Sequence, residues 1–140
     1  MTNIYLDIDG VLLANDKNQA RHADDFIKLV VENYHTYWLT THCKDDDNYA
    51  ADLLGRYFSE DTMKYIRKIK PTAWKTWKTE AIDFSKPFLW FDDDLFDEER
   101  KELEKHGVLE NWIEVDLKKN EDALGAFLSS FPIPIEKVKK

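Results

Sequence analysis

Residues 4–12 have the sequence Ile4-Tyr5-Leu6-Asp7-Ile8-Asp9-Gly10-Val11-Leu12, in which an apolar run leads into two aspartates and a glycine. The apolar run predicts a buried β-strand, and the two acids then lie together at its carboxyl end. Carboxylates in such a place repel one another and lose hydration, so a cation between them is expected. Mg²⁺, a hard ion that prefers oxygen ligands, suits this pair best. The motif taken alone is equally typical of a polar turn that ends a strand.

The length and charge of the chain limit the classes of protein to which it can belong. A length of 140 residues indicates one domain, which we expect over residues 1–131, followed by a flexible tail at 132–140. The 20 basic and 28 acidic residues give a formal net charge of −8. The molecule as a whole should therefore repel nucleic acid and anionic membranes, although a local basic patch could override this at short range.

Cysteine usage and hydropathy favour the cytoplasm. Cys43 is the single cysteine, which excludes an intramolecular disulfide. The N-terminal residues lack the basic and apolar regions of a signal peptide, and no apolar run approaches the roughly 20 residues that a bilayer span requires. We therefore expect a cytoplasmic protein with no membrane partner.

Apolar runs alternate with segments in which apolar residues recur at helical spacing. The runs predict β-strands over residues 3–8, 37–40, 88–91 and 112–115. The other segments predict helices over residues 24–33, 45–56, 59–68, 72–82, 96–106 and 120–128. This alternation predicts an α/β protein, a three-layer Rossmann-like fold with a parallel central sheet.

The third predicted strand also ends in acids, Asp92-Asp93-Asp94, with Asp97 three residues beyond. Because ligands of open parallel sheets gather at the carboxyl ends of the strands, these acids and Asp7 can share one crevice. A helix-loop-helix calcium site is the competing use of acidic runs, but it needs glycine at its sixth position and glutamate at its twelfth. Loops counted from the acidic runs of this chain have neither residue at those positions.

Hydroxyl and ammonium groups flank the predicted site. Thr40 and Thr41 end the second strand, and their hydroxyls can donate hydrogen bonds to a phosphate oxygen. Lys75 and Lys78, three residues apart, are expected on one face of the helix over 72–82, where either could neutralise a phosphoryl group. A helix-capping turn is the alternative for the threonines, and a solvated helix face is the alternative for the lysines.

Together these elements resemble the haloacid dehalogenase (HAD) superfamily of phosphotransferases and phosphatases, whose motifs occur in the same order. The first motif matches Asp7-Ile8-Asp9-Gly10-Val11, the second matches Trp38-Leu39-Thr40, and the fourth matches Leu89-Trp90-Phe91-Asp92-Asp93. For the third, helical lysine motif, Lys78-Thr79-Glu80-Ala81-Ile82 is more similar to the family pattern than the segment at Lys75. The resemblance covers residues 3–116 and is greatest to a small, capless branch, some of whose relatives occur in RNA repair proteins.

The resemblance implies roles for individual residues. Asp7 would be the nucleophile that forms an aspartyl phosphate, and Asp9 would be the general acid and base. Thr40 and Lys78 would bind the transferring oxygens, with Thr41 and Lys75 as further substrate-binding candidates.

The same resemblance implies a Mg²⁺ cofactor. The ion would be held by the carboxylates of Asp7 and Asp93 and by the backbone carbonyl of Asp9, and would screen repulsion between carboxylate and phosphate. Asp92, and Asp97 at the position of the family's extra acid, are further candidate metal ligands.

The gaps between motifs are too short for a large substrate-covering cap. Residues 12–24 have only loop length, and residues 44–74 hold about two short helices. An open site is therefore expected, which suits a phosphate displayed on a macromolecule or on a flexible ligand.

A basic and aromatic segment points to one such ligand. Its members are Lys64, Arg67, Lys68, Lys70, Lys75 and Lys78, interleaved with Tyr65, Trp74 and Trp77. Basic groups and stacking rings hold single-stranded nucleic acid, whereas the alternative is an ordinary amphipathic helix with solvated lysines.

The sequence thus predicts a Mg²⁺-dependent phosphatase with an open site that acts through an aspartyl phosphate, on phosphorylated nucleic-acid ends or on another accessible phosphate. The alternatives are a small-metabolite phosphatase and a non-catalytic binding or scaffold domain that keeps the fold.

Overall fold

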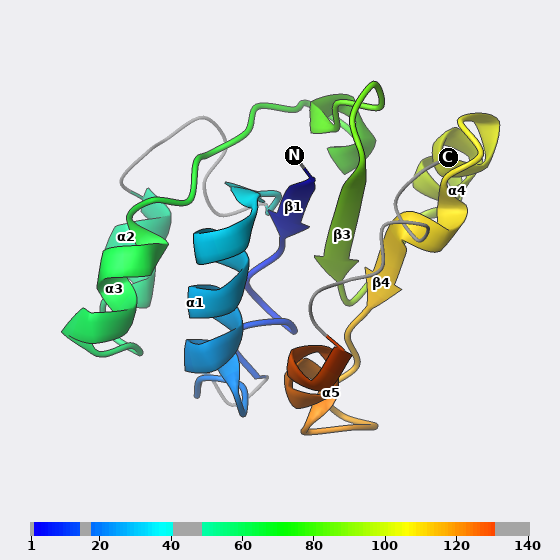
Figure 1. The fold of residues 1–140 in the computed structure, drawn as a ribbon. Helices are drawn as coiled ribbons and strands as arrows, with labels where there is room; N and C mark the ends of the chain where they lie inside the picture. The colour runs from blue at the N-terminus through cyan, green and yellow to red at the C-terminus, as the bar shows by residue number, and fades with distance from the viewer. Residues whose placement is uncertain (1, 15–17, 41–48, 131–140) are drawn as a thin grey trace.

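A parallel sheet carries the predicted site in this computed structural model, which describes residues 2–14, 18–40 and 49–130. In those residues, four strands lie in the order β2-β1-β3-β4 (Figure 1). They are β1 (Asn3–Leu6), β2 (His35–Trp38), β3 (Phe88–Asp92) and β4 (Trp112–Glu114). All of their pairings are parallel, which confirms the predicted α/β class and parallel sheet.

Helices cover both faces of the sheet. One face packs against α1 (Ala23–Asn33), α2 (Tyr49–Leu54), α3 (Glu60–Ile66) and α5 (Ala123–Ser130). The other face packs against α4 (Asp97–Lys105) and the segments around two 3₁₀ helices, η1 (Lys78–Ala81) and η2 (Leu109–Asn111). Figure 1 shows α4 on the opposite side of the molecule from α2 and α3.

The register explains which side chains meet on each face. Leu6 of β1 lies beside Trp38 and Phe91, and all three belong to the core on the α1 side. Tyr5 lies beside Trp90, and both belong to the core on the α4 side. Every residue of β3 is buried, as expected of a central strand that is covered on both faces.

The segment between β2 and β3 adds to the main core. Ala50 and Leu54 of α2 and Met63 and Ile66 of α3 belong to the same apolar cluster as Leu6. In the described part of the chain, α2 and α3 therefore form no separate core of the kind that a cap domain would need.

The prediction of a helix over residues 72–82 is wrong, because only Lys78–Ala81 is helical and that turn is a 3₁₀ helix. The carboxylate of Glu80 accepts hydrogen bonds from the backbone N–H groups of Lys75, Thr76 and Trp77, which are donors that a helix would otherwise use. The expectation that Lys75 and Lys78 share one helix face is wrong for the same reason.

Element ends also differ from the predictions. The first two strands end at Leu6 and Trp38, so that Asp7 and Thr40 lie beyond the strands instead of within them. Residues 41–48, with Thr41 and the start of the helix predicted over 45–56, lie outside the described residues, as does the predicted tail at 132–140. Among the described residues, no helix is long and apolar enough to cross a membrane.

Candidate active site

Three carboxylates meet at the carboxyl end of the sheet. Asp7 follows β1, Asp92 is the last residue of β3, and Asp93 comes next. One oxygen of each carboxylate lies within 4.8 Å of the others. The backbone N–H of Asp7 donates to the carbonyl of Phe91 at 3.1 Å, which continues the pairing of the two strands into the site. The pairing of β1 with β3 therefore brings together acids that are 85 residues apart in the sequence.

Lys78 supplies a cation to this cluster. Its Nζ lies 2.6 Å from Oδ2 of Asp92 and 3.7 Å from Oδ1 of Asp7. Lys75 is exposed, and its backbone N–H is bound by Glu80. The sequence did not decide whether Lys75 or Lys78 belongs to the site. In the structure, Lys78 is the one that contacts the carboxylates.

Both oxygens of the Asp92 carboxylate accept hydrogen bonds from neighbouring groups of the protein. Its Oδ2 accepts hydrogen bonds from Lys78 Nζ at 2.6 Å and from Trp90 Nε1 at 3.1 Å. Its Oδ1 accepts from the backbone N–H groups of Asp93 at 2.7 Å and Asp94 at 3.4 Å. These bonds fix the carboxylate, so Asp92 positions the lysine and the turn, and its oxygens are largely occupied by these donors.

Burial and mutual repulsion disfavour the negative charges in the cluster. Burial raises the pKa of Asp92 to about 7, and the charge of Asp7 adds to this effect. Burial also raises the pKa of Asp93 to about 6, helped by its hydrogen bond with Asp92 and by the charge there. Burial raises the pKa of Asp7 as well, although Lys78 opposes it. A positive charge beside these carboxylates, such as that of Lys78, therefore stabilises their ionised forms.

Lys78 remains charged in this setting. Burial alone lowers the pKa of its ammonium, but the charges of Asp7 and Asp92 together exceed that effect, so the pKa lies above its ordinary value. The lysine can therefore offer a positive charge to a bound phosphoryl group at any physiological pH.

Thr40 orients Asp7. It is 1 % exposed, lies two residues beyond the end of β2, and hydrogen-bonds through its side chain to the Asp7 carboxylate. The backbone N–H of Leu39 donates to the carbonyl of Leu6 at 2.8 Å, which places Thr40 beside the end of β1.

Gly10 allows the turn after β1 to lie against Asp93. Its φ is +81°, a conformation that favours glycine, and a Cβ at this position would collide with the Asp93 carboxylate. Asp9, the predicted acid and base, is half-buried in this turn. Asp97 is exposed at the first position of α4, and the described acids that could hold a metal together do not include Asp97 or the side chain of Asp9.

Glu99 supports the site and was missed by the sequence analysis. It is 2 % exposed, and its carboxylate accepts hydrogen bonds from the backbone N–H groups of Lys78 at 2.9 Å and Phe96 at 3.1 Å. It thereby ties the start of η1 to the start of α4. An acid at the third position of a helix is a known capping signal, but nothing local indicates its bond to Lys78.

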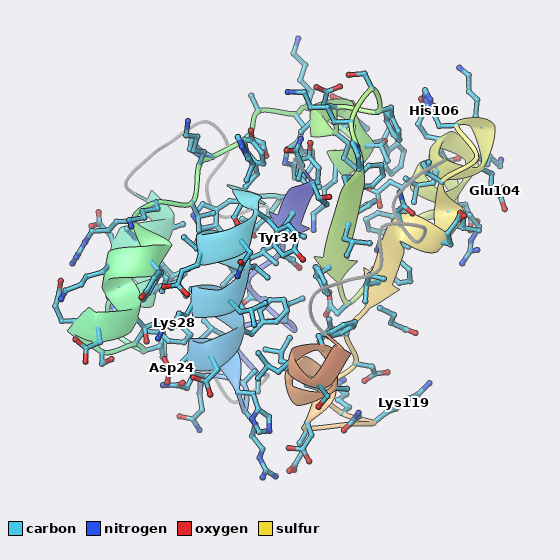
Figure 2. All side chains as sticks on the ribbon, in the orientation of Figure 1. Asp24, Lys28, Tyr34, Glu104, His106 and Lys119 are labelled. Carbon is cyan, nitrogen blue, oxygen red and sulfur yellow. The ribbon has the colours of Figure 1, made fainter. Side chains whose placement is uncertain are left out.

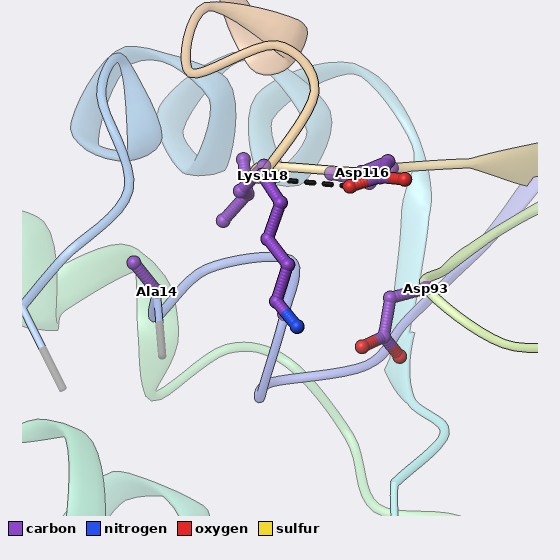
Figure 3. A pocket seen from close by; sticks show the side chains of 7 residues that line it. Ala14, Asp93, Asp116 and Lys118 are labelled. Atoms are coloured by element: carbon purple, nitrogen blue, oxygen red, sulfur yellow. Dashed lines mark hydrogen bonds between the residues drawn. The ribbon is translucent and has the colours of Figure 1, made fainter. Parts of the chain in front are cut away.

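A pocket lies against the carboxylates. Its volume is about 450 Å³, and it is lined by Gly10, Ala14, Asp93, Val115, Asp116, Leu117 and Lys118. Figure 3 shows the side chain of Lys118 extending into the space between Ala14 and Asp93. The sequence offered no signal for this lysine, which lies in the loop after β4.

The basic and aromatic segment is less available for a polyanion than its composition suggests. Arg67 forms a bidentate pair with Glu60, and the hydroxyl of Tyr65 donates to Glu32. Charged side chains of both signs project around the molecule, among them Asp24 and Lys28 on α1 and Glu104 on α4 (Figure 2).

Comparisons of the chain with protein-family models, with curated proteins and with solved structures gave no match.

Proposed function

We propose that the protein is a Mg²⁺-dependent phosphomonoester hydrolase in which Asp7 is the nucleophile. The observation that carries this proposal is the placement of the Asp7 carboxylate, which is buried at the end of the sheet, hydrogen-bonded to Thr40 and 3.7 Å from the ammonium of Lys78. A carboxylate held beside a fixed cation can approach a phosphate whose own negative charge would otherwise repel it.

The first step transfers the phosphoryl group to the enzyme. An oxygen of Asp7 forms a bond to phosphorus while the bond from phosphorus to the leaving oxygen breaks, and Asp9 gives that oxygen its proton. In the second step, Asp9 takes a proton from a water molecule that attacks phosphorus and breaks the bond to Asp7. Lys78 neutralises charge on the transferring oxygens in both steps, and Asp92 holds Lys78 in place.

The donor set fits Mg²⁺. Asp7 and Asp93 have carboxylate oxygens that lie close together, and the backbone carbonyl of Asp9, in the turn after β1, would be a further ligand. When bound there, the ion would screen the repulsion between carboxylate and phosphate. Burial raises the pKa of Asp93 to about 6, and a divalent cation bound beside it would offset the cost of its negative charge.

The described residues form no separate cap, so the substrate is a phosphomonoester that reaches the site directly. A small phosphorylated molecule and a phosphorylated nucleic-acid end both meet this condition. The net charge of −8 and the pairing of Arg67 with Glu60 favour the small molecule.

Hydrolysis of p-nitrophenyl phosphate with and without Mg²⁺ tests the proposal. Wild-type protein should release phosphate only with the metal, and Asp7→Asn should reduce the rate at least a thousandfold. Asp25→Asn, which removes an exposed acid of α1, is the matched control and should keep full activity. Wild-type rates in purified Asp7→Asn would exclude Asp7 as the nucleophile, and a metal-independent wild type would exclude the Mg²⁺ site.

A further inference from the structure

A pocket lies beside Asp93, at the edge of the carboxylate cluster. Gly10 and Ala14 line one side of it, and residues 115–118 line the other. Asp93 belongs both to the pocket and to the carboxylate cluster, so the pocket adjoins the proposed site of phosphoryl transfer. Its volume of about 450 Å³ falls within the usual range for small-ligand sites.

The loop that carries Lys118 is anchored to the sheet. The backbone N–H of Val115 donates to the carbonyl of Asp92 at 2.9 Å. One oxygen of the Asp116 carboxylate accepts from the backbone N–H groups of Lys118 at 3.1 Å and Lys119 at 3.2 Å. This turn fixes the backbone of Lys118 close to the end of β3, with its side chain aimed into the pocket (Figure 3).

The ammonium of Lys118 is available to a ligand. Among the described residues it forms no ion pair, whereas Nζ of its neighbour Lys119 lies 3.9 Å from Asp116. The side chains of Val115 and Leu117 and of Ala14 give the pocket apolar walls. The pocket thus combines the ammonium of Lys118 with apolar surface and with the carboxylates of Asp93 and Asp116. Asp116 accepts hydrogen bonds from the backbone of its own turn and lies 3.9 Å from Nζ of Lys119, and Asp93 belongs to the carboxylate cluster. Lys118 is therefore the group in this pocket that can receive the anion of an organic ligand.

We propose that this pocket binds the leaving group of the substrate and that Lys118 binds a second anionic group on it. The inference rests on the proposed function, and it narrows the substrate to a phosphomonoester with a second phosphate or carboxylate. A bisphosphorylated small molecule supplies that group directly, and a phosphorylated nucleic-acid end supplies it as the neighbouring phosphodiester. Both sources present the same chemistry to Lys118.

Paired substrates and paired variants test this inference. Thymidine 3′,5′-bisphosphate carries the second anion, p-nitrophenyl phosphate does not, and a 3′-phosphorylated oligothymidylate represents the nucleic-acid source. The measured quantity is the preference, defined as kcat/KM for the doubly charged substrate divided by kcat/KM for p-nitrophenyl phosphate. Lys118→Gln should reduce this preference tenfold to a hundredfold, as expected for a lost charge-assisted hydrogen bond. Lys119→Gln removes an adjacent ammonium outside the pocket and should leave both rates unchanged.

The outcome also separates the two sources of the anion. A preference for the bisphosphate that depends on Lys118, without a preference for the oligonucleotide, identifies a small-molecule substrate, and the reverse identifies a nucleic-acid end. A wild type with no preference for either, or an equal loss of preference in Lys118→Gln and Lys119→Gln, would overturn the inference.

A binding experiment keeps the inference separate from the catalytic proposal. Titration of thymidine 3′,5′-bisphosphate into Asp7→Asn with Mg²⁺, followed by calorimetry, requires no turnover. The double variant Asp7→Asn with Lys118→Gln should bind at least tenfold more weakly than Asp7→Asn alone. If the wild type hydrolyses no phosphomonoester, the proposed function fails, and equal affinities in this titration would refute the role of Lys118 independently.

Discussion

Neutralising Asp7 should stabilise the metal-free protein while it abolishes activity. The pKa of Asp7 is raised even though Lys78 lies 3.7 Å away, which means that the folded protein disfavours the charged carboxylate. Asparagine has nearly the same shape and can still accept the hydrogen bond from Thr40. The substitution therefore removes a destabilising charge and leaves the packing intact.

The magnitude follows from the effect of Asp7 on its neighbour. The increase in the pKa of Asp92 from 3.8 to about 7 corresponds to about 4 kcal/mol against its charged form. Burial is the largest cause, and the charge of Asp7 is the second. Because the charge of Asp7 is the second cause and not the first, its removal should raise the free energy of unfolding by about 1 to 2 kcal/mol in Asp7→Asn. For a chain of this size, Tm should rise by roughly 3 to 6 °C.

Thermal unfolding followed by circular dichroism at pH 7.5 in EDTA measures this shift. Glu104→Gln, an exposed substitution on α4 that removes the same formal charge, controls for the change in net charge. If Asp7→Asn melts below both the wild type and this control, attraction to Lys78 outweighs the repulsion among the carboxylates. The electrostatic reasoning for the site would then be refuted.

Three further outcomes are expected. Mg²⁺ should raise the Tm of the wild type by mass action. Asp93→Ala should lose that increase in Tm, and Asp97→Ala should keep it. If only Asp97→Ala loses the increase, Asp97 and not Asp93 is the metal ligand. Glu99→Gln should lower stability by about 1 to 3 kcal/mol and reduce kcat, because one of its two backbone donors, that of Lys78 or of Phe96, loses its acceptor. Unchanged melting and rates in Glu99→Gln would contradict its positioning role. The last outcome concerns Asp92 in EDTA. In the folded protein its carboxyl keeps a proton up to about pH 7, whereas in the unfolded chain it releases that proton near pH 4. The free energy of unfolding should therefore fall by about 2 kcal/mol between pH 5 and 7. Denaturant unfolding at several pH values measures this slope, and a stability that rises over the same range would contradict the raised pKa.

The sequence alone determined the strands and the acids that follow them. The apolar runs before Asp7 and Asp92 predict buried strands because burial on both faces requires continuous apolar sequence. The spacing of apolar residues predicts α1, whose buried residues include Phe26 and Val30. Because both acids lie at the carboxyl ends of parallel strands, their convergence also follows from the sequence.

Only the tertiary structure decided which polar groups act together. Periodicity predicts a helix over residues 72–82, but the carboxylate of Glu80 captures the backbone donors there, and this outcome depends on a side-chain conformation that no local pattern encodes. The choice of Lys78 over Lys75, the bond from Glu99 to Lys78 and the position of Lys118 in the pocket depend on pairing between distant segments. A hydropathy pattern reports how deeply each residue is buried and with what period, whereas the partner of a buried charge is set by the register of the sheet and the packing of the loops around it.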